Sequence, residues 1–318
     1  MSTQKGIAGN YRRHERRCGV ARPFQRVLEE INPPEFEAVA QRLDSIDLTS
    51  AQEKFEDLKV FYHPNTLHQI IALKEYLLKR EEAGELDQVD RWIRMVAINR
   101  LTGHSNGFFS VYSMPPNQAV SINSQRKINA RREQTPDDRD IVSRILKKSK
   151  SLLKDWDGAP LTHEGHMLSA LLTTEDAGNV AGIEQGVAQL VVTSPPFLDV
   201  VNYQADNWLR CWFLGLDSSE IAISQLKNAD EWVSAMTDVM RDLKRIVAPG
   251  GHVAFEVGEV RNGKLLLEEL VVPAGVEAGL EPVIIMINAQ KFTKTANTWG
   301  VDNQQKGTNT NRIVIFQR

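Results

Sequence analysis

The chain contains 318 residues, of which 42% are hydrophobic, and its formal net charge is −3. This size allows one large or two modest domains, and the net charge disfavours uniform electrostatic binding of nucleic acid. No stretch approaches the run of about 18 apolar residues that a membrane span needs, and no apolar core of a secretory signal follows the arginine-rich N-terminus. We therefore expect a cytoplasmic protein without a membrane partner.

The two cysteines, Cys18 and Cys211, indicate neither a disulfide framework nor a zinc site. Cys211 lies between Trp208 and Trp212 in the sequence, so we expect a thiol buried in the core. The histidines lack carboxylate or cysteine partners at the spacing of metal ligands. The sequence therefore predicts no metal site.

Up to residue 160 the sequence favours helices. Apolar residues recur with helical period in four segments, 24–31, 35–46, 67–80 and 86–100. A further helix has its apolar positions between Ile141 and Trp156. We interpret residues 1–160 as a helical region and a candidate DNA-contacting insert.

Basic residues gather in and before that last helix. They include Arg131, Arg132, Lys147, Lys148 and Lys150. Contact with the phosphates of duplex DNA would use such a cluster and would make binding sensitive to salt. A solvated helix face accounts for the same charges equally well.

Beyond residue 160, strands are expected near 170–174, 188–193, 252–257, 282–288 and 312–317. They alternate with helices, notably 230–247, where apolar residues repeat with helical period. The polar stretch 291–310 is typical of a long loop between the last two strands. Residues 161–318 are therefore predicted to form an α/β domain.

The most informative segment is the apolar strand that ends in Ser194-Pro195-Pro196-Phe197. Two prolines forbid both continuation of the strand and a helix, so the chain must turn at the edge of a sheet. The fixed backbone can hold the Ser194 and Pro195 carbonyls as acceptors, and Phe197 offers a flat apolar face. An amino group on a planar ring would fit there, although a purely structural proline turn has the same sequence.

A second motif is typical of a different function. Residues from Gly258 to Lys264 have the Gly-x4-Gly-Lys spacing of a phosphate-binding loop between a strand and a helix. Such a loop needs a hydroxyl at the next position to hold magnesium, and Leu265 has none. The motif therefore gives little support to a nucleoside triphosphatase.

The segment Thr193-Ser194-Pro195-Pro196-Phe197 resembles the catalytic turn of the DNA methyltransferases that act on exocyclic amino groups. Other segments resemble the same family in the expected order. They are 171–177, similar to the preceding strand and its acidic tip, 202–216, similar to an aromatic-rich helix, and 245–258, similar to a helix, a Pro-Gly-Gly turn and the fifth strand. Residues 61–70 and 101–105 are similar to a helical insert of one branch.

This resemblance implies a Rossmann-like sheet that uses S-adenosyl-L-methionine, with a helical N-terminal region. It implies a site-specific DNA methyltransferase acting on double-stranded DNA, with cytosine N4 favoured over adenine N6 by the Ser-Pro-Pro-aromatic form. The turn would hold the base through Ser194, Pro195, Pro196 and Phe197. The cofactor would be contacted by Asp176, Ala177 and Thr193. Cytosine C5 chemistry is disfavoured because that family's cysteine usually follows a proline, whereas both cysteines here follow arginines.

The chain departs from the family in one respect. The glycine-rich cofactor loop, Phe-x-Gly-x-Gly or a near relative, is absent from the 318 residues, and the acid that holds the cofactor ribose has no candidate. The methyltransferase sheet is therefore expected to be incomplete. A restriction-linked or orphan enzyme active alone, a subunit of a split enzyme completed by a second polypeptide, and a non-catalytic DNA-binding relic all stay open.

Overall fold

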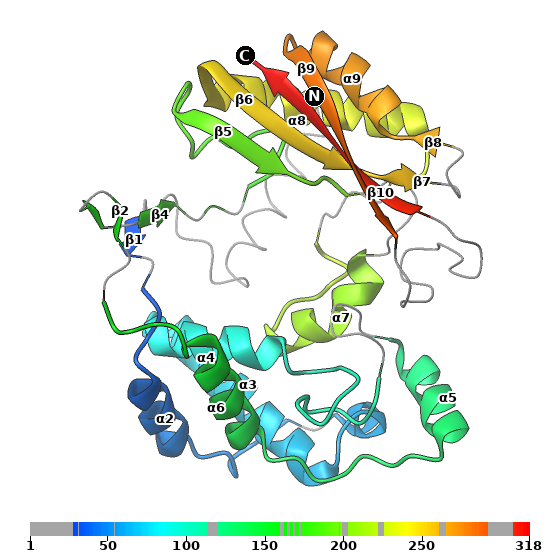
Figure 1. The fold of residues 1–318 in the computed structure, drawn as a ribbon. Coiled ribbons are helices and arrows are strands. Elements are labelled where there is room, and N and C mark those ends of the chain that lie inside the picture. Colours follow the sequence, from blue (N-terminus) through cyan, green and yellow to red (C-terminus); the bar gives the residue numbers. More distant parts are fainter. Residues whose placement is uncertain are drawn as a thin grey trace, which may run out of the picture. The chain divides into compact units, whose positions relative to one another are not determined.

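The computed structural model describes residues 28–30, 32–53, 55–113, 120–159, 162–163, 166–167, 169–171, 173, 175–196, 198, 203–221, 226–260, 265–291 and 308–318. By internal contacts the chain divides into two units (Figure 1). Unit 1 comprises Met1–Leu172 and Gln204–Ala222, and unit 2 comprises Thr173–Tyr203 and Ile223–Arg318. None of the helices in the described ranges is long and apolar enough to cross a membrane.

Unit 1 is helical. Its helices are α2 (Phe36–Ser45), η1 (Glu56–Val60), α3 (Pro64–Glu82), α4 (Gln88–Ile98), α5 (Ile122–Arg132), α6 (Ile141–Leu152) and α7 (Tyr203–Phe213). Short strands also belong to it, with β1 (Leu28–Glu30) pairing with β4 (Ser169–Leu171) and β2 (Thr162–His163) with β3 (His166–Met167).

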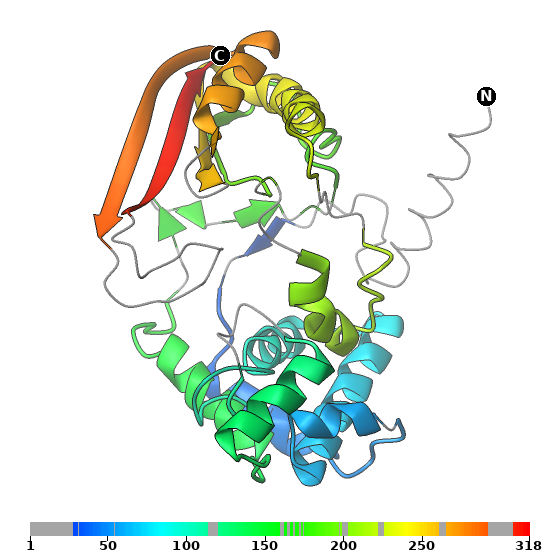
Figure 2. The ribbon, with the colours of Figure 1, turned by 90° about the vertical axis from the view of Figure 1, so that its right-hand side faces the viewer.

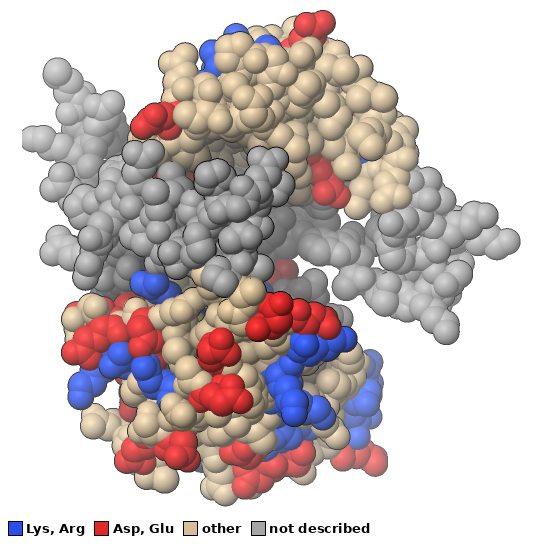
Figure 3. All heavy atoms as spheres, turned by 60° about the vertical axis from the view of Figure 1, so that its left-hand side comes forward, with Lys and Arg blue, Asp and Glu red and all other residues tan. Residues whose placement is uncertain are grey.

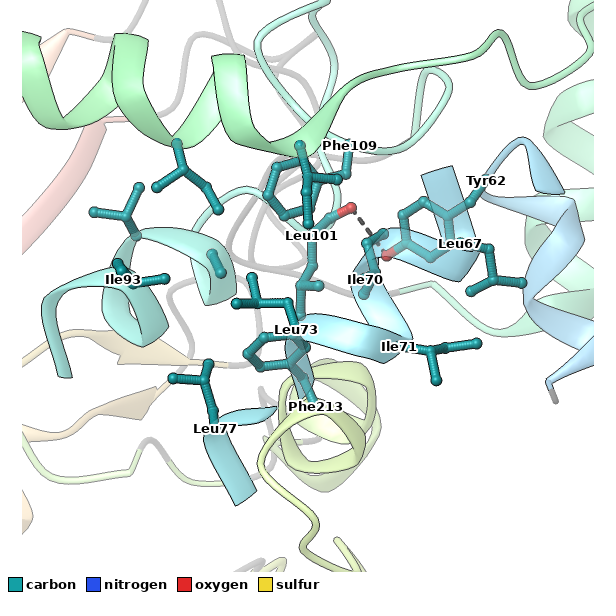
Figure 4. Packing of buried hydrophobic residues seen from close by; sticks show 14 of the residues in the cluster. Tyr62, Leu67, Ile70, Ile71, Leu73, Leu77, Ile93, Leu101, Phe109 and Phe213 are labelled. Atoms are coloured by element: carbon teal, nitrogen blue, oxygen red, sulfur yellow. Dashed lines mark hydrogen bonds between the residues drawn. The ribbon is translucent and has the colours of Figure 1, made fainter. Parts of the chain in front are cut away.

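The core of unit 1 draws on segments far apart in the sequence. Figure 4 shows Phe213, from α7, packed beside Leu73 and Leu77 of α3. The buried Tyr62 hydroxyl donates a hydrogen bond of 3.0 Å to the carbonyl of Leu101, and burial raises its pKa. Because Phe213 is buried in this core, α7 is part of the helical unit although it follows a strand of unit 2.

A buried carboxylate ties three helices of unit 1 together. Asp90 of α4 is fully buried and pairs with Arg80 of α3 at 2.7 Å and with Arg42 of α2. A buried charge is tolerated only when it is paired and hydrogen-bonded, as it is here from two sides. This contact fixes the mutual packing of α2, α3 and α4.

Unit 2 is a sheet with helices. Its elements are β5 (Ala188–Thr193), α8 (Ala229–Ile246), β6 (Val247–Val257), β7 (Glu259–Val260), β8 (Leu265–Leu266), α9 (Glu268–Glu277), β9 (Glu281–Lys291) and β10 (Thr308–Gln317). Four strands form one sheet in the order β5-β6-β10-β9. The pair β5–β6 is parallel, whereas β10 is antiparallel to both of its neighbours.

Helices α8 and α9 cover one face of this sheet, and Figure 2 shows them on the same side of it. Val253, Phe255, Val314 and Phe316 point to that side and are fully buried. Gly275 of α9 lies so close to the Phe316 ring that an added Cβ would collide with it. The glycine therefore permits the close approach of α9 to the sheet.

The opposite face of the sheet is uncovered by the described residues. The strand registers align Val192, Ala254, Ile315 and Ile284 in one row across the four strands. Val192 is 72% exposed and Ile284 is 55% exposed, and Leu190 on the same face of β5 is 60% exposed. Parallel strands normally have helices on both faces, and among the described residues the β5–β6 pair has them on one face only.

Most predicted elements are confirmed. Helices form in the predicted segments 35–46, 67–80, 86–100 and 230–247, and strands form at 188–193, 252–257, 282–288 and 312–317. The Pro-Gly-Gly turn is absorbed into a longer β6 that begins at Val247, with Gly250 at a φ of 77°. The mixed α/β character of residues 161–318 is thus confirmed.

Three expectations need correction. The strand expected at 170–174 forms as Ser169–Leu171 but pairs with Leu28–Glu30, and it does not join the main sheet. Leu28–Glu30 is itself a strand within the segment 24–31 that was expected to be helical, and the rest of that segment lies outside the described residues. The division at residue 160 also differs from the contacts, which assign α7 to unit 1.

Candidate functional site

The Ser-Pro-Pro turn lies at the carboxyl end of β5, where Thr193 is in register with Phe255 of β6. Ser194 is exposed, and Thr193, Pro195 and Pro196 are half-buried. Phe197 lies outside the described residues. Because β5 is the outermost strand on its side of the sheet, the turn stands at a sheet edge, as the two prolines predicted.

The turn is anchored from both sides. The indole nitrogen of Trp232, in the first turn of α8, donates a hydrogen bond of 3.0 Å to the carbonyl of Pro196. Trp232 is 2% exposed, and the next described residue of the turn, Leu198, is fully buried in the same core. The Pro196 carbonyl thus serves the fold, and the acceptor roles predicted for Ser194 and Pro195 do not compete with it.

Asn228 directs α8 to this position. Its side chain accepts hydrogen bonds from the backbone of Asp230 at 2.7 Å and of Glu231 at 3.3 Å, which caps the helix. The cap fixes where α8 begins and therefore where Trp232 meets the turn. The sequence indicated Trp232 only as one of several apolar positions of helical period, so its role at the site could not be recognised from that pattern.

Asp176 and Ala177 occupy a different part of unit 2. Asp176 forms a tight turn in which it accepts a hydrogen bond of 2.8 Å from the backbone of Gly178. With Asp238, Arg241, Asp242 and Arg245 it lines an open hollow of about 460 Å³ against α8. Asp238 follows Trp232 by six residues, roughly 9 Å along the helix axis, so Asp176 packs beside the middle of α8 rather than at the Ser194 turn.

The segment that carries Asp176 is clamped to α8. Arg245 donates to the carbonyls of Ile183 at 2.8 Å and Val180 at 2.7 Å, and Asp242 accepts from the Val180 backbone at 2.9 Å. The two side chains also pair with each other at 2.7 Å. Hydrogen bonding from Arg245 lowers the pKa of Asp242. These bonds give the charges of the hollow a structural role.

The basic residues of the predicted DNA-contacting cluster all belong to unit 1. Arg131 and Arg132 end α5, where the Arg132 guanidinium lies 3.7 Å from the centre of the Tyr112 ring. Lys147, Lys148 and Lys150 lie on α6, where Lys147 and Lys150 are exposed and Lys148 is half-buried. On the face drawn in Figure 3, basic and acidic side chains of this unit alternate. DNA contact by these residues stays a prediction.

Two further sequence predictions can be placed. Cys211 is buried, and burial raises the pKa of its thiol, which confirms a core role, whereas Cys18 lies outside the described residues. Around the phosphate-loop motif, Val260 of β7 pairs antiparallel with Leu265 of β8. The described residues on either side of the motif thus pair with each other, and a short strand, β8, stands between the motif and helix α9.

No protein-family model matches the chain, and no curated protein matches it. Among solved structures, a Thermus thermophilus protein provisionally described as a DNA modification methylase is 19% identical over 45% of this chain and 50% of its own, with a TM-score of 0.28. Its complex with S-adenosyl-L-methionine is 19% identical over 45% and 53%, with a TM-score of 0.26. A SAM-dependent methyltransferase of Methanosarcina mazei is 9% identical over 55% and 76%, with a TM-score of 0.29.

The chain thus spans about half the length of the Thermus protein that it matches. TM-scores this low do not establish a shared fold. The functional assignment below therefore rests on the residues of this chain.

Replacement of Trp232 by Phe tests whether the indole bond holds the turn. Phe fills much of the buried space but cannot donate to Pro196, so the turn should lose about 0.5–1.5 kcal/mol of stabilisation. We expect the amides of Ser194 and Leu198 to exchange with solvent up to about tenfold faster, as measured by hydrogen exchange, with the fold retained. Trp156→Phe is the matched control, because it removes an indole bond of 3.0 Å to Ala159 in unit 1. Unchanged exchange at Ser194 and Leu198 would refute the anchoring role.

Proposed function

We propose that this chain is a site-specific, S-adenosyl-L-methionine-dependent DNA methyltransferase that binds the target base at its Ser-Pro-Pro turn and modifies an exocyclic amine, with cytosine N4 as the target. The observation that carries the proposal is the Ser194-Pro195-Pro196 turn at the carboxyl end of an edge strand. Ligands of open α/β sheets bind at that end of the strands. The Trp232 bond holds the turn in place without using Ser194 or Pro195.

The residues of the turn suit recognition of a planar base with an amino group. A target base must leave the duplex before its amine is reached, and Phe197 would then stack on it. Ser194 and the Pro195 carbonyl would accept hydrogen bonds from the amine, which draws its lone pair out of conjugation and orients it. No strong base is needed for this role. The cofactor, when bound, supplies the electrophilic methyl group.

The described residues do not by themselves form a cofactor pocket. Thr193 adjoins the turn, whereas Asp176 lies beside the middle of α8, and the glycine-rich loop is missing from the sequence. Most directed hydrogen bonds to such a cofactor come from a loop of that kind at a helix N-terminus.

A second candidate, a subunit of a split methyltransferase, is favoured by the free edge of β5. This strand pairs only with β6 among the described residues, carries no charged residue, and exposes Leu190 and Val192. Natural edge strands are normally protected by charges, prolines or a covering element. We propose that a second polypeptide adds the cofactor-binding strands along β5 and covers the open face. A non-catalytic DNA-binding relic is the remaining alternative.

The first test is methyl transfer to duplex DNA, with identification of the methylated nucleoside by mass spectrometry. The proposal expects N4-methylcytosine from the complete enzyme. Phe197→Ala should lower transfer by roughly tenfold or more, because base stacking is worth about 1–3 kcal/mol, and should leave thermal stability nearly unchanged. Val187→Ala, which truncates a side chain that is 54% exposed before β5, is the matched control. Unfolding of Phe197→Ala without a specific loss of transfer would instead indicate a structural proline turn.

The second test concerns cofactor binding by calorimetry. Because each missing hydrogen bond costs about 0.5–3 kcal/mol, the chain alone should show no saturable binding at ordinary cofactor concentrations. It should gain binding with a polypeptide that carries the glycine-rich strand-loop-helix. Val192→Lys should block that gain, whereas Val276→Lys, at a 53% exposed position of α9, should not. A micromolar dissociation constant for the chain alone would contradict the split-subunit proposal and favour a self-sufficient enzyme.

The third test concerns DNA. If α6 contacts phosphates, replacing Lys147, Lys148 and Lys150 together by Gln should weaken binding to all duplexes alike. The slope of log affinity against log salt should flatten by up to about three units. As the control, replacing Lys59, Lys79 and Lys244 together by Gln changes the net charge by the same amount. This variant should leave the slope of log affinity against log salt unchanged. An unchanged slope in the α6 variant would indicate that its lysines lie on a solvated helix face and do not contact phosphates.

A further inference from the structure

β9 is a long edge strand whose middle is apolar and exposed. β9 is the last strand of the sheet and pairs only with β10 among the described residues, and Figure 2 shows it outermost. It runs over 11 residues, Glu281–Lys291. Its consecutive apolar residues from Val283 to Ile287 are between 41% and 60% exposed. A strand of this kind is a template for pairing with another chain.

Between residues 283 and 288, the described part of β9 lacks the usual protection of an edge strand. Charged side chains, inward-pointing charges and bulges that bend the edge away normally prevent pairing. In β9 the only charged residues are the first and the last, Glu281 and Lys291. Pro282, which cannot donate a hydrogen bond, stands next to the start of the strand, and the register irregularity with β10 lies at the same end. Among the described residues, the stretch 283–288 is therefore an edge without charges.

The sequence of β9 is complementary to itself in antiparallel orientation. If a two-fold axis passes through Met286, residue 281 of one copy lies opposite residue 291 of the other. In this register the acidic position 281 lies opposite the basic position 291 at both ends of the paired strands, and Ile285 lies opposite Ile287 on each side of the axis. Opposite charges directly across a strand pair are favourable, as are pairs of β-branched residues. A two-fold axis also closes the assembly at two copies.

We propose that β9 is the interface of a homodimer, in which it pairs antiparallel with β9 of a second copy of this chain, centred on Met286. The pairing joins the two four-stranded sheets edge to edge. The occupant is a second copy because the end charges fit that partner and that orientation. This inference is independent of the proposed enzymatic function.

The register makes a specific variant informative. Because Met286 faces its own counterpart across the axis, Met286→Lys places two ammonium groups side by side, and Met286→Glu places two carboxylates there. Each variant alone should be monomeric at micromolar concentration, whereas the wild type is dimeric, as measured by size-exclusion chromatography with light scattering. An equimolar mixture of the two variants should form a mixed dimer, because unlike charges then face each other. Met286 is 53% exposed, so the substitutions do not disturb the core.

A second set of variants tests the ends of the strand. Glu281→Lys or Lys291→Glu alone turns two attractive pairs into two repulsive pairs and should weaken the dimer by roughly tenfold or more in sedimentation equilibrium. The double variant E281K/K291E restores the pairs and should restore the dissociation constant. Leu190→Lys, on the opposite edge of the sheet at 60% exposure, is the control and should leave the dimer intact.

Three results would overturn the proposal. One is a wild-type chain that stays monomeric at high micromolar concentration. Another is a dimer that survives Met286→Lys. The third is an association that Leu190→Lys abolishes, since this would place the interface at β5. None of these outcomes bears on methyl transfer, so failure of the dimer and failure of the enzyme assignment are distinguishable.

Discussion

A parallel pair of strands needs cover on both faces, and among the described residues the β5–β6 pair is covered on one face only. Helices α8 and α9 bury Val253 and Phe255 on one face, while Val192 stays 72% exposed on the other. Full burial of such a side chain contributes about 1.5–3 kcal/mol. Two or three of them can therefore decide whether another element docks. The apolar side chains of the open face are exposed for this reason.

Helix α8 contacts both the covered face of the sheet and the candidate site. It supplies the apolar layer of the covered face, its first turn holds the Ser-Pro-Pro turn through Trp232, and its last turns clamp the segment 175–186 through Arg245. The indole bond is a small part of this, because one hydrogen bond is worth about 0.5–1.5 kcal/mol, less than burial of an aromatic ring. The fold can therefore survive the loss of the bond while the geometry of the turn relaxes.

The sequence predicted the elements whose partners lie close by in the chain. Residues 230–247 and 67–80 have strong helical period because each buries a single face. The helix expected at residues 24–31 was wrong at Leu28–Glu30, because a short apolar segment fits a helix or a strand equally well. Leu28–Glu30 pairs with Ser169–Leu171, which lies far along the chain. The sequence also did not predict that α7 belongs to unit 1. It follows a strand of unit 2, yet Phe213 packs on α3 of unit 1, and no local pattern encodes such a contact.

At the site, the sequence identified the turn because prolines act locally, but it could not reveal its supports. Trp232 has the same helical period as its neighbours, and only the fold shows that its indole meets Pro196. Asp176 is the reverse case. Its resemblance to an acidic strand tip depends on pairing with the main sheet, and the strand that precedes it, Ser169–Leu171, pairs elsewhere. A role that depends on a non-local strand pair cannot be assigned from the order of motifs alone.

The two free edges of the sheet differ in what they can accept. An element added at β5 has to run parallel to it to bring its carboxyl end to Ser194, and it must also cover the open face. The β9 edge can pair antiparallel with itself because its end charges are opposite in sign. Strands lie about 4.8 Å apart, so pairing through β9 would leave the two β5 strands at opposite ends of the joined sheet, roughly 34 Å apart before twist is considered. Each copy would then keep its own Ser194 turn and its own β5 edge, and dimer formation would neither complete nor block the proposed site.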